Sequence, residues 1–205
     1  MEDDNQLQDI NWVSNLNIAQ THNQLIMVLA TGEKAIISMH NKDINGNWEE
    51  LFSTSGYVGK NGIGKAKEGD MKTPTGVYKF TSAFGIKENP GTVFDYIQVD
   101  DSYYWVDDSN SKYYNKFVST SNIQKDWTSA ENIISTGKAY NYVLALNYNE
   151  QCVPGAGSAI FLHCSTGNST AGCISVSENY MKEILNNIRK DCVIVIDSED
   201  NILGY

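Results

Sequence analysis

Long hydrophobic runs and proline are both scarce in this sequence of 205 residues. No run approaches the roughly 18 consecutive apolar residues that a membrane-spanning helix needs, so we expect no membrane insertion. Only three prolines are present, and 41% of the residues are hydrophobic. This composition excludes a proline-rich linker and a disordered chain of low hydrophobicity. It predicts a globular protein with a well-filled core.

Positive charge is also in short supply. Lys and Arg number 15 against 25 Asp and Glu, which gives a formal net charge of −10. A surface of this sign repels the phosphate backbone of nucleic acids and anionic lipids, so we expect no nucleic-acid partner. The first residues, Met1 to Asp4, are acidic where a secretory signal peptide would be basic. We therefore identify no export signal at this end. A chain from which such a signal had been removed would look the same, so the compartment stays open.

Cysteine is limited to four positions, all in the last third of the chain: Cys152, Cys164, Cys173 and Cys192. None belongs to a CxxC pair, and none has the Cys/His spacing of a zinc site. We therefore expect neither a metal nor another cofactor. Cys152 and Cys192 could form a disulfide in an oxidising compartment or remain buried thiols, and the sequence leaves both alternatives open.

Short runs rich in Val, Ile, Tyr and Phe dominate the sequence and predict β-strands. Asn45-Gly46 predicts the turn of a hairpin, because both residues tolerate positive φ. Glycine-rich and polar stretches at 56–76 and 107–116 predict loops. The predicted strands cover residues 24–30, 34–39, 77–81, 94–99, 103–106, 140–146, 158–163 and 192–197.

One segment has clear helical periodicity. Four apolar residues recur at i, i+3, i+4 and i+7, which predicts a helix from Ser177 to Lys190 with Ser177 as its N-cap. The predicted buried face consists of Met181, Ile184, Leu185 and Ile188. A shorter helix is predicted over 129–134. The fold class expected is mainly β with α, a mixed β-sheet or sandwich. We expect a single domain over 1–205, with 1–23 as a candidate N-terminal extension.

A histidine and a cysteine near the end of the chain form a candidate catalytic pair. His163 ends an apolar strand just before a polar loop, and Cys173 follows ten residues later. Gly172 precedes the cysteine and allows a tight backbone turn with accessible amides. A nearby imidazole can lower the pKa of a thiol and accept its proton. The alternative is structural: a small buried thiol and a hydrogen-bonded histidine at a strand end.

The residues around this pair resemble the active-site signature of the L,D-transpeptidase catalytic domain (YkuD-like) family, whose members cross-link or trim bacterial peptidoglycan. The resemblance lies in GSAIFLH, which ends at His163, and in STAGCISV, which contains Cys173. YVGKNG and EGDMKTPTG, further upstream, look like the glycine-rich and TPxG segments of the family. YWVDD at 104–108 and LNYN at 146–149 resemble a divergent branch of it. Together these segments span residues 57–196.

This resemblance implies a role for each matching residue. Cys173 corresponds to the nucleophile that attacks a peptide carbonyl, and His163 to the base that takes its proton. The backbone amides of Gly172 and Cys173 would hold the oxyanion. The backbone carbonyl of Cys164 would orient the imidazole. The thiol of Cys164 is the second candidate nucleophile, but strand alternation points it away from His163.

The sequence also departs from the family pattern in two places. The common signature has Ser-His before Gly-Cys and Arg two residues after the cysteine, whereas this chain has Thr170-Ala171 and Ser175. Loss of that arginine removes the usual means of holding the substrate. Thr170 and Ser175 are the candidate substrate-binding residues. The gap between His163 and Cys173 is short, which implies a small loop over the cleft.

Two hypotheses of function follow. The first is a cysteine acyl-transfer enzyme on peptidoglycan stem peptides, an L,D-transpeptidase if an amine accepts the acyl group and an L,D-carboxypeptidase if water does. The second is a non-catalytic cell-wall-binding module that keeps the fold and the cleft. Either implies an extracellular or cell-wall location, and neither predicts an oligomeric state. Asp107 and Asp108 are expected to cap loops, and His22 and His40 to lie at the surface or in turns.

Overall fold

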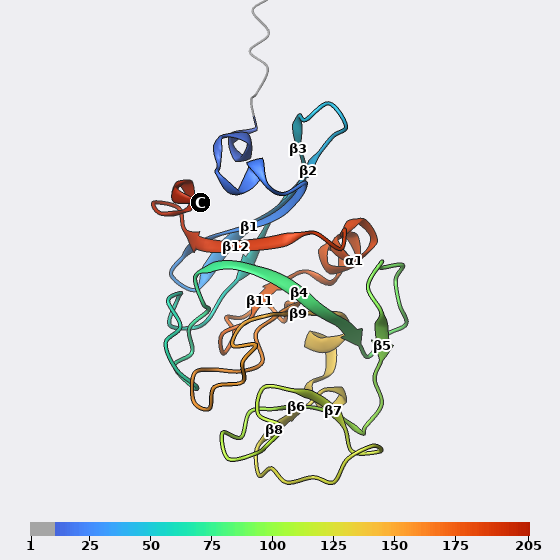
Figure 1. Cartoon of the computed structure of the whole chain (residues 1–205). Coiled ribbons are helices and arrows are strands. Elements are labelled where there is room, and N and C mark those ends of the chain that lie inside the picture. Colours follow the sequence, from blue (N-terminus) through green and yellow to red (C-terminus); the bar gives the residue numbers. More distant parts are fainter. Residues whose placement is uncertain (1–10) are drawn as a thin grey trace, which may run out of the picture.

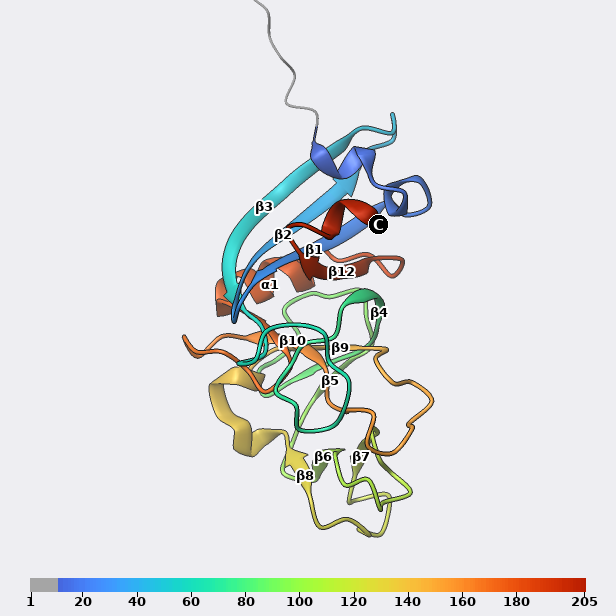
Figure 2. The same cartoon turned by 90° about the vertical axis from the view of Figure 1, so that its left-hand side faces the viewer.

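A closed ring of strands dominates the computed structural model, which describes residues 11–205. The largest sheet has the order β12-β1-β2-β3-β11-β10-β9-β4-β5, and β4 also pairs with β12, which closes the first eight of these strands into a ring (Figures 1 and 2). The strands are β1 (Gln24–Thr31), β2 (Lys34–Lys42), β3 (Trp48–Tyr57), β4 (Gly76–Gly85), β5 (Tyr96–Gln98), β9 (Val143–Leu146), β10 (Phe161–Cys164), β11 (Ile174–Val176) and β12 (Val193–Ser198). This architecture confirms the predicted fold class, mainly β with α. The first ten residues of the candidate N-terminal extension lie outside the described residues.

A smaller sheet of three strands, in the order β7-β6-β8, packs beside the ring. It consists of β6 (Tyr103–Val106), β7 (Phe117–Ser119) and β8 (Ala130–Asn132). Figure 1 shows it at the opposite end of the molecule from the short 3-10 helices η1 (Trp12–Asn15) and η2 (Ile18–Gln20). Aromatic packing joins the two sheets, because the ring of Phe84 stacks on Phe117 with centroids 4.5 Å apart and lies edge-on to Phe161 at 5.7 Å.

The α-helix predicted from periodicity is present as α1 (Glu178–Asn187). The hydroxyl of Ser177 accepts a hydrogen bond from the N–H of Tyr180, as expected of an N-cap. The four residues of the predicted apolar face are at most 2% exposed, and burial of each stabilises the fold by roughly 1.5–3 kcal/mol. Within residues 11–205, no helix is long and apolar enough to cross a membrane.

Side-chain alternation along β9 and β10 places residues in two separate cores. Leu144, Leu162 and Cys164 belong to the main core, to which every strand of the ring and α1 contribute. Phe161 belongs to the second core, between the ring and the smaller sheet. His163 shares the face of Phe161, because successive side chains of a strand alternate between its two faces. The imidazole therefore points toward the smaller sheet, and the thiol of Cys164 points away from it, as predicted.

The short helix predicted over 129–134 is wrong. Residues Ala130–Asn132 form strand β8, and the 3-10 helix η3 (Ile134–Tyr140) follows it. Asn132 pairs with Tyr104 of β6, so the neighbouring strand determines the conformation of this segment. So short a helix would gain little stability from its own hydrogen bonds. The strand pairing prevails over the local pattern.

The surface position expected of His40 is also wrong, because this side chain is 0% exposed. Strand β2 continues beyond its predicted end, and the imidazole packs edge-on against Trp12 of η1 at 5.9 Å. Its two ring nitrogens lie 2.7 Å from the hydroxyl of Ser38 and 3.0 Å from the side-chain amide of Asn11. The N-terminal segment thus covers a strand end that the sequence alone left at the surface.

Candidate active site

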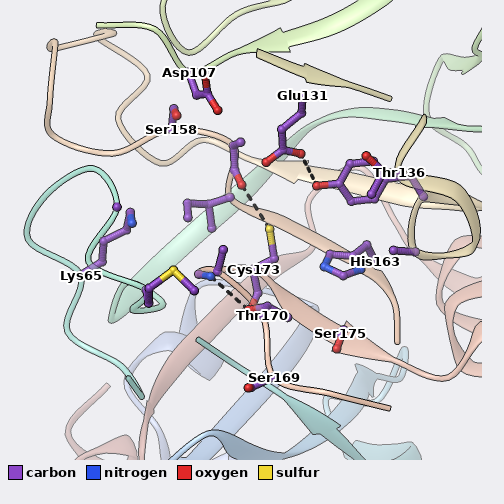
Figure 3. Close-up of a pocket in the computed structure, with 18 of the residues that line it drawn as sticks. Lys65, Asp107, Glu131, Thr136, Ser158, His163, Ser169, Thr170, Cys173 and Ser175 are labelled. Carbon is purple, nitrogen blue, oxygen red and sulfur yellow. Dashed lines mark hydrogen bonds between the residues drawn. The ribbon is translucent and has the colours of Figure 1, made fainter. Parts of the chain in front are cut away.

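His163 and Cys173 line the same cavity, which has a volume of about 390 Å³ (Figure 3). His163 lies in β10, which runs parallel to the neighbouring β11 and pairs His163 with Ser175. Cys173 lies immediately before β11, at the end of the loop that connects the two strands. The pairing thus brings the two candidate residues to one place, although ten positions separate them in the sequence.

Cys173 is 7% exposed, and its thiol donates a hydrogen bond to the carbonyl oxygen of Ala159 at 3.1 Å. Ala159 has a φ of 54°, which is unusual for a residue other than glycine and favours a functional explanation. Its own N–H donates to the side-chain oxygen of Asn115 at 3.1 Å, which holds the segment in place. Burial raises the pKa of the Cys173 thiol, so sulfur carries its proton at neutral pH.

The imidazole of His163 is oriented by its own neighbour along the chain. Nδ1 lies 3.0 Å from the carbonyl oxygen of Cys164, which is the contact implied by the family resemblance. A carbonyl oxygen only accepts hydrogen bonds, so Nδ1 carries the proton and Nε2 keeps its lone pair. Burial lowers the pKa of His163 to about 4, although its backbone hydrogen bonds act in the opposite direction. The ring is therefore neutral at neutral pH and can accept a proton through Nε2.

The turn before Cys173 is held by hydrogen bonds to a threonine hydroxyl. Oγ1 of Thr170 accepts from the N–H of Gly172 at 3.1 Å and donates to the carbonyl oxygen of Cys173 at 2.6 Å. Gly172 has a φ of 147°, and a Cβ there would lie 2.8 Å from the carbonyl oxygen of Lys72. Only glycine fits this position without a shift of the backbone. Thr170 therefore shapes the turn that presents the thiol.

Ser175 occupies the position at which the common family signature has arginine. The residue is 1% exposed and belongs to the cavity lining, where it is paired with His163 of the neighbouring strand. Among the described residues, none is hydrogen-bonded to this hydroxyl, an unusual arrangement for a buried polar group. The position thus contributes a small uncharged group where the family signature has a long cation.

The sequence did not indicate two residues of the cavity, Tyr140 beside His163 and Glu131 next to Tyr140. The ring of Tyr140 is edge-on to the imidazole, with centroids 5.4 Å apart. Its hydroxyl donates a hydrogen bond to Glu131 of β8. Burial raises the pKa of Glu131 to about 7, although the hydrogen bond from Tyr140 opposes this. Glu131 was not identified because its segment has a local helical pattern, and only the strand pairing turns it toward the cavity.

A buried ion pair lines another part of the cavity, in the loop between β3 and β4. The side chain of Lys65 is 2% exposed, and its Nζ lies 3.0 Å from a carboxylate oxygen of Asp70. Burial of Asp70 opposes its ionisation, but hydrogen bonds from Lys65 and three backbone N–H groups outweigh it and hold the pKa below its usual range. The three N–H groups belong to Ala66, Lys67 and Lys72. The sequence shows these residues only as part of a glycine-rich loop.

The adjacent residues Asp107 and Asp108 differ in role. Asp108 caps its loop as predicted, because it accepts hydrogen bonds from the N–H groups of Asn110 at 2.9 Å and Thr128 at 2.8 Å. Asp107 instead belongs to the cavity lining. One of its carboxylate oxygens is buried, with no hydrogen-bond partner among the described residues. The prediction of a loop cap therefore holds for one aspartate of the pair.

The remaining cysteines lie away from the cavity. The thiol of Cys164 faces the main core, and burial raises its pKa to about 12. Cys152 and Cys192 are both free thiols, which answers the question that the sequence left open. Cys173 is thus the cysteine that lines the cavity with His163.

Comparisons with known proteins found similar solved structures and one matching family. The chain is similar to the helical cell shape determining protein Pgp2 from Campylobacter jejuni, with 14% identity, a TM-score of 0.47 and coverage of 89% of this chain and 52% of that one. It is also similar to the L,D-transpeptidase (Yku) from Stackebrandtia nassauensis, with 12% identity, a TM-score of 0.37 and coverage of 86% and 56%. The chain spans about half the length of these solved structures. No curated protein matched it.

A model of the L,D-transpeptidase catalytic domain, YkuD, matches residues 35–196, which is well over half of the sequence. The chain therefore belongs to the L,D-transpeptidase catalytic domain (YkuD) family.

Proposed function

We propose that this protein is a cysteine acyltransferase that acts on the stem peptides of peptidoglycan. The observation that carries the proposal is the placement of the Cys173 thiol and the neutral His163 imidazole on one cavity. Membership of the family supports a function related to peptidoglycan. An extracellular or cell-wall location belongs to the same proposal, since that is where this polymer lies.

The proposed reaction proceeds through a thioester. Nε2 of His163 takes the thiol proton as the sulfur of Cys173 attacks the peptide carbonyl carbon. The carbon–nitrogen bond then breaks, and the imidazolium returns the proton to the departing amine. An amine or water attacks the thioester, gives up a proton to Nε2 and releases the acyl group as a new amide or a carboxylic acid. The thiol regains its proton at the end of this second half.

The backbone amide of Cys173 is the proposed donor to the oxyanion. The N–H of Gly172, which the family resemblance also suggests for this role, donates to Thr170 in this structure. Loss of a single donor of this kind costs about 10²–10³ in rate in other acyl-transfer enzymes. Rotation of the Thr170 hydroxyl would release the Gly172 amide as a second donor. We therefore assign the Cys173 amide as the first donor to the oxyanion and the Gly172 amide as the second.

A non-catalytic cell-wall-binding module remains the second candidate, and two observations favour it. The Cys173 thiol has a raised pKa, and the arginine of the common family signature is replaced by Ser175. A binding module would retain the cavity and recognise the same peptides without forming a thioester. The two candidates differ in one measurable property, which is whether Cys173 becomes acylated.

Incubation with purified muropeptides, followed by mass spectrometry of both protein and peptides, tests the proposal. We expect the intact protein to gain the mass of an acyl group and the peptides to be shortened or cross-linked. Cys173→Ala should abolish both changes, and His163→Ala should slow them by about 10²–10⁴. Cys164→Ala is the matched control, because its thiol faces the core, and it should retain most activity.

Two outcomes would overturn this proposal. Products that persist in the Cys173→Ala variant would place the nucleophile elsewhere. Peptide binding by the native protein without acylation or product would establish the binding module instead. Added amines separate the two acyl-transfer reactions, since a transpeptidase incorporates the amine into the product and a carboxypeptidase releases the free acid.

A further inference from the structure

The side chain of Lys65 reaches the turn that presents Cys173 through space left by two glycines. A Cβ on Gly157 would lie 2.5 Å from Cε of Lys65, and a Cβ on Gly172 would lie 3.6 Å from its Nζ. Both glycines have positive φ, at 114° and 147°. The ammonium is thus brought next to the Gly172–Cys173 turn inside the molecule. Figure 3 shows Lys65 and His163 on opposite sides of Cys173.

The carboxylate of Asp70 fixes the position of the Lys65 ammonium but accepts only one of its N–H donors. Asp70 takes one of the three N–H donors of Lys65, at 3.0 Å. Three backbone N–H groups also donate to Asp70, at 2.7, 3.0 and 3.1 Å, and share its negative charge. Lys65 therefore keeps donors and part of its positive charge for a further acceptor. A buried cation of this kind binds an anion more strongly than a solvated one does.

Lys65 differs in charge from the rest of the cavity lining. Among the lining residues in the described part of the chain, Lys65 alone is a Lys or Arg. The family's arginine position holds the uncharged Ser175. Three carboxyl groups also line the cavity: Asp107 and Glu131 lie on another side of it, as Figure 3 shows, and Glu68 accepts hydrogen bonds from the hydroxyls of Tyr114 and Ser158. Lys65, beside Cys173, is thus the lining residue that attracts an anionic group entering the cavity.

We propose that Lys65 binds a carboxylate of the acyl donor, close to the carbonyl that Cys173 attacks. This inference rests on the proposed function and names a specificity-determining residue for it. The carboxylate that fits this place is the C-terminal one of the residue that leaves, because it lies a few bonds from the scissile amide.

Alkylation of Cys173 tests the inference without any substrate. Iodoacetate carries a carboxylate next to the carbon that sulfur attacks, and iodoacetamide is its neutral counterpart. The rate ratio of the two reagents at Cys173, measured by peptide mass spectrometry, reports the charge at the turn. We expect Lys65→Met to lower the ratio of iodoacetate to iodoacetamide by roughly fivefold or more, and Lys65→Arg to restore much of it.

The controls come from the same chain. Lys67→Met removes an exposed lysine from the same loop, and its backbone N–H still donates to Asp70, so the ratio should not change. The ratio at Cys152, which lies outside the cavity lining, should be the same in every variant. An unchanged ratio at Cys173 in Lys65→Met, or failure of both reagents to reach Cys173 in the folded native protein, would overturn the inference.

A second experiment examines the substrate directly. Stem peptides with a free C-terminal carboxylate should acylate the native protein faster than the same peptides with a C-terminal amide. In Lys65→Met this preference should disappear, with the loss confined to the free carboxylate. If acylation proceeds but the preference survives in this variant, the inference fails while the proposed function stands. If no peptide acylates Cys173, the proposed function fails, and the alkylation ratios still decide the role of Lys65.

Discussion

Cys173 and His163 line one cavity as neutral groups, because burial raises the pKa of the thiol and lowers that of the imidazole to about 4. A preformed thiolate–imidazolium pair would react at a rate that is constant across neutral pH. We expect alkylation of Cys173 by iodoacetamide to accelerate steadily from mildly acidic to mildly alkaline pH, because the thiolate fraction grows with pH. Stopped-time labelling with peptide mass spectrometry measures this profile. A plateau around neutral pH would contradict the neutral pair.

Single residues differ in how far the sequence could identify them. Cys173 and His163 were predicted because each stands in a recognisable local motif. Lys65 and Glu131 were not, because their place in the cavity depends on contacts between distant segments. Lys65 reaches the turn only through the space beside Gly157 and Gly172. Glu131 meets Tyr140 only because β8 pairs with β6. No local pattern records such contacts.

At the scale of elements, the predicted helix α1 offers a direct measurement of packing. Ile184 is 0% exposed in the main core, whereas the neighbouring Glu183 is exposed. Ile184→Ala should lower the free energy of unfolding by about 2–5 kcal/mol through lost contacts and a residual cavity. Glu183→Ala should change it by less than about 0.5 kcal/mol. Urea denaturation followed by circular dichroism measures both. Equal effects would show that this face is not the buried one.

Elements were predictable where their residues alone carry the pattern. The apolar strands β1 and β12 and the amphipathic helix α1 have such patterns. Strand β3 is rich in Glu, Ser and Thr, and it forms because it pairs along its length with β2. Strand β11 has three residues and is held between β10 and β3. Strands of this kind exist through their neighbours, so the closed ring could not be read from the sequence.

The stability of the whole molecule should depend on pH through three buried groups. The pKa values of His40 and His163 are lowered by burial from 6.5 to about 4, so the unfolded chain binds more protons than the folded one within that interval. The stability that the two neutral histidines contribute is therefore lost as pH falls from 6.5 to about 4. Burial raises the pKa of Glu131 from 4.5 to about 7, so its contribution has the opposite sign and is lost as pH rises. Two histidines outweigh one glutamate, and we expect stability to increase with pH from 4.5 to 6.5.

Glu131→Gln isolates the opposing contribution, since glutamine can still accept the hydrogen bond from Tyr140. In the Glu131→Gln variant, the free energy of unfolding should rise more steeply with pH between 4.5 and 6.5 than in the native protein. Urea denaturation of both proteins at a series of pH values gives the two slopes. A slope unchanged by the substitution would mean that Glu131 titrates alike in the folded and unfolded chains.

The parallel pairing of β10 and β11 has a consequence for how this protein can diverge. The hydrogen-bonded strands fix the separation between His163 and the start of β11, so the loop that connects them is not needed to set it. The tip of that loop, Thr166 to Asn168, is exposed, and two of its residues line the cavity. Insertions and replacements at the tip would alter this part of the cavity lining while His163 and Cys173 keep their places. The shape of this part of the cavity can therefore change without a change in the positions of His163 and Cys173.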